Sequence, residues 1–190
     1  MRKHILHIAN NYFGTKVYSN LFKSLEENGY KNTIIVPLPE GVLIENSFIP
    51  KNVKIIYIPI ISLLLSRFFP WIRSNIVFQH LIENNLIRDI DYVHAHTVHS
   101  NGWIGYRVSK YCKCPLIISI RQVDINDAIP INMHLRGYYK KIIKHAKLTA
   151  PNPTFVEKIN KWFPNTIVKV IPNYIDEKWW QSSQLCQKGI

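Results

Sequence analysis

The sequence is poor in acidic residues and in cysteine, and it contains no long hydrophobic run. Asp and Glu number 12 against 24 Lys and Arg, so the chain of 190 residues carries a formal net charge of +12 at pH 7. The three cysteines are an odd number, and Cys112 and Cys114 with a single distant Cys186 lack the paired spacing of a zinc site. We therefore expect reduced thiols.

The most apolar stretch, residues 59–71, is too short to cross a bilayer, which needs about 20 residues, and Arg67 and Pro70 interrupt it. It is interpreted as a core helix or, alternatively, as an interfacial segment whose Leu, Phe and Trp side chains enter the head-group region. The first residues have a basic start but no small-residue cleavage site, so we expect no signal peptide. These features predict a cytoplasmic protein, with peripheral attachment to the inner face of the membrane if the interfacial interpretation holds.

Several motifs of catalysis and binding are also missing. The sequence has no Gly-x-Ser-x-Gly and no Cys beside a His pattern, which leaves nucleophilic catalysis without support. The first strand-to-helix turn lacks Gly-x-Gly-x-x-Gly, which disfavours a nicotinamide-binding domain. Recognition-helix and RNA-binding motifs are absent too, so nucleic acid is not an expected partner.

The positive charge is concentrated where carboxylates are absent. No Asp or Glu occurs in residues 47–82 or 128–156, and the second span contains Arg136, Lys140 and Lys144 at four-residue steps. On a helix this spacing places the three cations in one stripe. A solvated face is the usual explanation of such a stripe, and binding to an anionic membrane surface or to a substrate phosphate is the alternative.

Residues 91–126 form the most informative unit of the chain. Residues 91–95 and 116–120 are short apolar runs typical of buried parallel strands, and residues 102–113 between them have helical spacing of apolar positions. Each strand ends in polar residues, which are His96, Thr97, His99, Ser100 and Asn101 after the first and Arg121, Gln122, Asp124 and Asn126 after the second. Ligands of open α/β sheets bind outside the carboxyl ends of the strands, so both groups should line one crevice.

The remaining apolar runs predict an α/β fold with a doubly wound, mostly parallel, Rossmann-like sheet of about seven strands. Further strands are expected at residues 3–9, 32–36, 53–58, 147–150 and 166–171, and further helices at 16–28, 74–88, 132–146 and 153–162. Hydrophobic residues make up 47% of the composition, enough for one sizeable core.

The central unit resembles the acceptor-side half of family 4 glycosyltransferases, which are retaining sugar-nucleotide enzymes of the GT-B fold. The matching positions are Asp91, His94, His96, Gly102, Pro115, Arg121, Asp124 and Asn126. Residues 170–176, Val-Ile-Pro-Asn-Tyr-Ile-Asp, are similar to the linker that joins the two halves of these enzymes, with Tyr174 in place of the usual Gly. The resemblance covers about residues 3–177 and implies domain boundaries at 1–176 for the Rossmann-like domain and 177–190 for a linker or tail.

The resemblance also implies which residues contact substrates. Gly14, with Thr15 and Lys16, stands where the family loop faces the donor diphosphate, although most members have two adjacent glycines there. His96, Arg121 and Asp124 are implied in catalysis, and His99, Asn101, Asn126 and Asn173 in substrate binding. Many members have His at the position of Arg121; an Arg cannot act as a base, but it can stabilise charge on a leaving diphosphate. The alternative interpretation is an ordinary pairing of Arg121 with Asp124 across a loop.

A metal site is a further alternative. His94, His96 and His99 form a His-x-His-x-x-His set that suits metal ligation, but only Asp91 and Asp124 are near in sequence to complete it. Since enzymes of this fold generally need no bound metal, we expect none, and no cofactor.

The resulting functional hypothesis is the acceptor-binding half of a retaining glycosyltransferase. Its partners would be a nucleotide-sugar donor, a glycan or lipid-linked acceptor, and a missing C-terminal domain or partner subunit. Because the resemblance implies that the nucleotide binds mostly in the second half, the isolated 190-residue chain is expected to be inactive. The competing hypothesis is a non-catalytic binding or scaffold module that keeps the fold.

Overall fold

A single parallel sheet organises the computed structural model, which describes residues 2–10, 12, 17–39, 53–60 and 69–173. The strands are β1 (His4–Ile8), β2 (Lys31–Pro39), β3 (Val53–Ile60), β4 (Tyr92–Ala95), β5 (Leu116–Ser119), β6 (Ala146–Ala150) and β7 (Val168–Val170). Their order is β3-β2-β1-β4-β5-β6-β7, and every neighbouring pair is parallel. The predicted fold class and its seven strands are confirmed.

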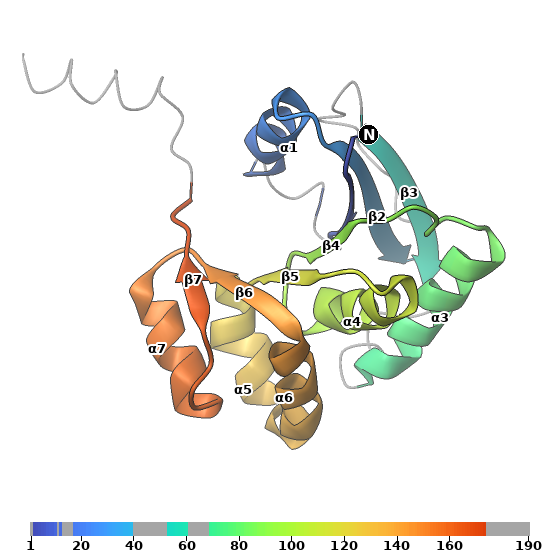
Figure 1. Ribbon diagram of the computed structural model, residues 1–190. Helices are drawn as coiled ribbons and strands as arrows, with labels where there is room; N and C mark the ends of the chain where they lie inside the picture. The colour runs from blue at the N-terminus through green and yellow to red at the C-terminus, as the bar shows by residue number, and fades with distance from the viewer. Residues whose placement is uncertain (1, 11, 13–16, 40–52, 61–68, 174–190) are drawn as a thin grey trace, which may run out of the picture.

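Helices cover the two faces of the sheet unequally. They are α1 (Val17–Glu27), α3 (Pro70–Glu83), α4 (Ser100–Cys112), α5 (Ile129–Ile131), α6 (Arg136–His145) and α7 (Pro153–Trp162), with a π-helical turn η1 (Asp124–Ala128) and a 3-10 turn η2 (Met133–Leu135). Figure 1 shows α1 on one side of the sheet and α3, α4 and α6 on the other. Two hydrophobic clusters result, a large one that includes residues of α3, α4 and α6 and a small one that includes residues of α1 and β2.

The strand β5 is buried on one face, whereas its apolar sequence predicted burial on both. Leu116 and Ile118 are buried and lie against α4, but Ile117 and Ser119 are half-buried. Successive side chains of a strand point to opposite faces, and α4 covers only one of them. Near the end of α4 the predicted apolar spacing does not give burial, since Tyr111 is 57% exposed.

The segment that follows β5 is helical earlier than predicted. The sequence suggested a polar loop and then a helix from about residue 132, but η1 begins at Asp124 and α5 continues through Pro130. Pro130 lies at the second position of α5, directly after the π-helical turn η1. The α6 helix itself begins only at Arg136.

Gly105 allows α4 to pack directly on the sheet. A Cβ at this position would lie 2.9 Å from Leu116 Cδ1 and 3.2 Å from Ala95 Cβ, which is closer than normal contact. We expect Gly105→Ala to lower the free energy of unfolding by about 1 kcal/mol, since overpacking outweighs the gain in helix propensity. Urea denaturation measures the change.

Gly137 is the matched control for this substitution. It lies in α6, and a Cβ there would meet nothing within 4 Å. Gly137→Ala should therefore stabilise the protein by about 0.5 kcal/mol, because only the gain in helix propensity remains. Equal effects of the two substitutions would contradict the close packing of α4 on the sheet.

Candidate active-site crevice

Asp124 joins the two polar segments at the carboxyl edge of the sheet. Its Oδ1 accepts hydrogen bonds from the backbone N–H groups of Val98 (2.9 Å) and His99 (3.2 Å), and its Oδ2 accepts one from the backbone N–H of Arg121 (3.0 Å). The side chain is fully buried, at 0% exposure. The carboxylate thus fixes the loop after β4 to the turn after β5.

Burial and hydrogen bonding shift the pKa of Asp124 in opposite directions. Burial raises the pKa of the carboxyl group to about 6, while the three backbone N–H donors and the nearby Arg121 lower it. Both carboxylate oxygens are occupied by backbone donors, so the geometry gives Asp124 a positioning role in the crevice. It is tied to the backbone of Arg121, and the side-chain pair considered as an alternative is not formed in the described part of the chain.

Arg121 provides a positive charge at this edge. Its side chain is half-buried, and Nη1 donates a hydrogen bond of 3.4 Å to Oδ1 of Asn173, at the end of the described chain. Among the described residues no carboxylate forms an ion pair with it. Its charge lowers the pKa of Tyr18, His94 and His96, although burial raises the pKa of Tyr18 overall. The guanidinium group is therefore available to bind an anion.

The loop after β1 reaches the same edge. The side-chain amide of Asn10 donates a hydrogen bond of 2.8 Å to Oγ of Ser100, in the first turn of α4. The amide oxygens of Asn10 and Asn101 are buried and have no hydrogen-bond partner in the described structure. Buried acceptors are normally satisfied, so these two unpaired oxygens are exceptions among the described residues. Asn10 was not among the site residues predicted from the sequence.

His96 lies directly after β4 in a cluster of three histidines. It is 1% exposed, and its Nε2 is 3.2 Å from Nδ1 of His7, whose Nε2 is 3.1 Å from Oδ1 of Asn32. His94 Nε2 is 2.8 Å from Oγ of Ser119. Asn32 Oδ1 can only accept, so His7 carries its proton on Nε2 and its Nδ1 accepts from His96. The remaining nitrogen of His96, Nδ1, has no hydrogen-bond partner among the described residues.

The histidines of this cluster are neutral at pH 7. Burial lowers the pKa of His7 to about 4 and holds the pKa values of His94 and His96 well below 6.5. The mutual repulsion of the rings and the charge of Arg121 add to the effect on His94 and His96.

Among the described residues, the same three histidines are the group whose nitrogens could ligate a metal ion. One nitrogen from each of His7, His94 and His96 lies within 4.8 Å of the others. The set considered from the sequence used His99, but Nδ1 of His99 is 2.6 Å from the hydroxyl of Tyr139. No carboxylate belongs to the cluster and Arg121 adds positive charge, so the site opposes a divalent cation electrostatically. The arrangement suits three hydrogen-bonded neutral imidazoles.

The other predicted site residues differ from one another in exposure, and some lie outside the described residues. His99 and Asn101 are buried at the start of α4, whereas Asn126 and Asn173 are exposed. Gly14, Thr15 and Lys16 lie outside the described residues, as does the proposed domain boundary at 176. His7 was not predicted as a site residue, because a single His in an apolar strand gives no indication of a site. Only the pairing of β1 with β4 brings His7 opposite His94.

The comparisons with known proteins agree with this architecture. The family model of Glycosyltransferase Family 4 matches residues 14–179. A search of curated proteins gave no match. Among solved structures, sucrose-phosphate synthase from Thermosynechococcus elongatus is similar with a TM-score of 0.62 and 12% identity, over 98% of each chain.

This chain spans about half the length of two further solved structures. Anabaena HepE, in complex with UDP and glucose, has a TM-score of 0.63 and 14% identity over 97% of this chain and 49% of its own. LpCGTa, in complex with UDP, has a TM-score of 0.57 and 11% identity over 96% of this chain and 56% of its own. These likenesses at low identity show the fold, and the family match covers most of the chain. The protein belongs to glycosyltransferase family 4.

Proposed function

We propose that this chain is the acceptor-binding half of a retaining glycosyltransferase that moves a sugar from a nucleotide sugar to a polysaccharide or glycolipid precursor. The observation that supports it best is the position of Arg121, a cation without a carboxylate partner among the described residues, at the carboxyl edge of a parallel sheet. Ligands of such sheets bind at this edge, and guanidinium groups bind phosphate through paired hydrogen bonds.

Each site residue has a distinct part in this proposal. Arg121 stabilises the charge on the leaving diphosphate, together with the backbone of Gly14 and Thr15, which lie outside the described residues. The amide oxygens of Asn10 and Asn101 are unpaired in the described structure but enclosed, so in this proposal they accept hydrogen bonds from sugar hydroxyls only after the segments around them move apart. Asp124 and His96 are positioning residues in the present geometry, because protein groups occupy both carboxylate oxygens and His96 is buried.

In this proposal, a further domain or a partner subunit supplies the rest of the enzyme. HepE and LpCGTa bind UDP, and this chain spans 49% and 56% of their lengths. We expect a C-terminal domain or a partner subunit to hold the base and ribose of the donor. The carboxyl edge with Arg121 supplies one wall of the site, and the 190 residues alone should be catalytically silent. We place the working enzyme in the cytoplasm, peripherally at the inner face of the membrane, where a lipid-linked acceptor would be available.

A non-catalytic scaffold module is the second candidate. It is favoured by the burial of His96, His99 and Asp124 and by the use of their polar atoms in protein contacts. Co-purification separates the two candidates. A partner that carries the second half and restores sugar transfer supports the enzyme, and a partner that binds without any transfer supports the scaffold.

Binding of nucleotide sugars to the chain alone should be weak. We expect a millimolar dissociation constant for UDP-sugars or GDP-sugars, about 4 kcal/mol, because only the diphosphate and sugar find partners. An NMR titration should shift the amide signals of Arg121 and Asn173. Arg121→Gln should weaken binding about tenfold, since it removes a charge-assisted hydrogen bond.

Arg88→Gln is the control for this titration. Arg88 precedes β4, at the amino edge of the sheet, and donates a hydrogen bond to Asn85, so its loss should leave binding unchanged. Tight, base-selective binding by this chain would overturn the half-enzyme proposal. The same affinity in the Arg121 and Arg88 variants would show that the anion binds elsewhere.

A further inference from the structure

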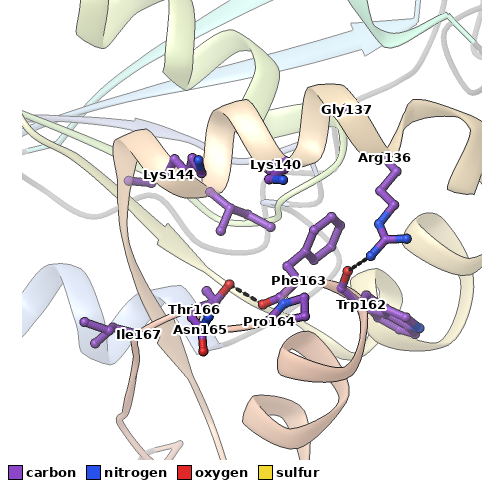
Figure 2. Close-up of a pocket in the computed structure, with 12 residues that line it drawn as sticks. Arg136, Gly137, Lys140, Lys144, Trp162, Phe163, Pro164, Asn165, Thr166 and Ile167 are labelled. Carbon is purple, nitrogen blue, oxygen red and sulfur yellow. Dashed lines mark hydrogen bonds between the residues drawn. The ribbon is translucent and has the colours of Figure 1, made fainter.

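The basic stripe of α6 lines a groove of about 920 Å³. Arg136, Lys140 and Lys144 lie along the helix on one side, and residues 162–167 form the other side (Figure 2). Nη2 of Arg136 donates a hydrogen bond of 2.8 Å to the carbonyl oxygen of Trp162, which joins the two walls at one end. We refer to this feature as the α6 groove.

Lys144, at one end of the α6 groove, lies toward the opposite edge of the sheet from Arg121. The helix ends at His145 and β6 begins at Ala146, so Lys144 lies near the amino edge of the sheet. Arg121 lies at the carboxyl edge, and the five residues of β6 between these edges span about 16 Å. An anion bound by Lys140 and Lys144 is therefore not the donor diphosphate held at Arg121.

The charge of the α6 groove is not balanced locally. No Asp or Glu lines it, and none occurs in residues 128–156. Lys140 and Lys144 are exposed, and neither has a hydrogen-bond or ion-pair partner in the part of the chain that the structure describes. The groove is thus complementary to an anionic surface.

The opposite wall contains apolar side chains that are open to solvent, together with Asn165 and Thr166. Ile167 is 92% exposed, the most exposed large hydrophobic residue described, and Trp162 is half-buried beside the exposed Pro164. An apolar side chain at full exposure next to cations is the arrangement that enters a membrane interface, where lipid phosphates meet the cations. A free phosphate would use the lysines and leave this wall unused.

We propose that the α6 groove docks the domain on an anionic bilayer by binding lipid phosphate groups through Lys140 and Lys144 while Ile167 enters the head-group region. This inference rests on the peripheral location proposed above and names the surface responsible. None of the described helices has the length and apolar character needed to traverse a bilayer. The other segment considered from the sequence, residues 59–71, lies mostly outside the described residues, although Pro59 and Ile60 belong to β3 and Trp71 to α3.

Vesicle binding of the full chain tests the proposal. Sedimentation should show binding to vesicles of phosphatidylcholine with phosphatidylglycerol, little binding to phosphatidylcholine alone, and a decline with added salt. The double variant Lys140→Gln/Lys144→Gln should bind about 30-fold more weakly, or about 2 kcal/mol at 1.4 kcal/mol per tenfold change. Ile167→Ser should weaken binding in a way that salt does not alter.

The control variant is Lys23→Gln/Lys54→Gln, which removes the same charge from exposed positions on α1 and β3. It should bind vesicles nearly as well as the unmodified chain. An equal loss in both double variants would overturn the proposal in favour of net charge alone. Equally strong, salt-sensitive binding to duplex DNA, or full displacement from vesicles by millimolar inorganic phosphate, would also overturn it. The nucleotide-sugar titration at Arg121 is independent of these outcomes and tests the proposed function separately.

Discussion

Replacing Asp124 with Ala should lower the free energy of unfolding by about 3 to 5 kcal/mol, measured by urea denaturation. The substitution leaves the backbone N–H groups of Val98, His99 and Arg121 without their acceptor in a fully buried place. Each unsatisfied buried donor costs about 1 to 3 kcal/mol, and water entering the vacated space recovers part of that cost.

Asp124→Asn should have an intermediate effect. An Asn oxygen at the position of Oδ1 still accepts from Val98 and His99, but its NH2 group then faces the N–H of Arg121, donor against donor. Asp127→Ala, at an exposed position of the same η1 turn, is the control and should change stability by less than about 0.5 kcal/mol. If Asp124→Ala and Asp127→Ala have similar effects, Asp124 does not hold the two loops together.

The general architecture could be predicted because local patterns determine it. Apolar runs bounded by polar residues mark parallel strands, and the carboxyl ends of such strands must share an edge. The hydrogen bond between Asn10 and Ser100, and those from Val98 and Arg121 to Asp124, confirm that these loops share that edge.

The roles of individual side chains could not be predicted in the same way. The sequence shows that Asp124 and His96 follow strands, but it does not show which atoms fill their hydrogen-bonding capacity. Backbone donors take both oxygens of Asp124, and His7, 89 residues away along the chain, takes Nε2 of His96. Such pairings depend on tertiary distances of about 3 Å, which residue spacing does not encode.

The same buried groups make stability depend on pH. The pKa of His7 in the folded chain is about 4, below its value of 6.5 in the unfolded chain, so the unfolded state takes up a proton first as the pH falls. The contribution of His7 to stability is complete above about pH 6.5 and is lost between 6.5 and 4, a loss of about 3 kcal/mol. His94 and His96 act in the same direction.

Protonation of Asp124 changes the free energy of unfolding in the opposite direction to protonation of the histidines. Its pKa is raised to about 6 in the folded chain from 3.8, so the folded state takes up this proton first. Protonation of Asp124 therefore adds stability as the pH falls from about 6 to 3.8, by up to about 3 kcal/mol. As the pH falls, three histidines lower the free energy of unfolding and one carboxyl group raises it. We therefore expect the free energy of unfolding to fall overall between pH 6.5 and 4.

Single substitutions separate the opposing contributions. In Asp124→Asn the carboxyl group no longer titrates, so the slope of unfolding free energy against pH should become steeper between pH 6 and 4 than in the unmodified chain. In His7→Gln the slope should become shallower, because one neutral buried imidazole is gone while Gln can still bond to Asn32. Urea denaturation at half-unit pH intervals measures both slopes. A stability that is flat from pH 6.5 to 4 in the unmodified chain and in both variants would show that these groups are not buried as the structure places them.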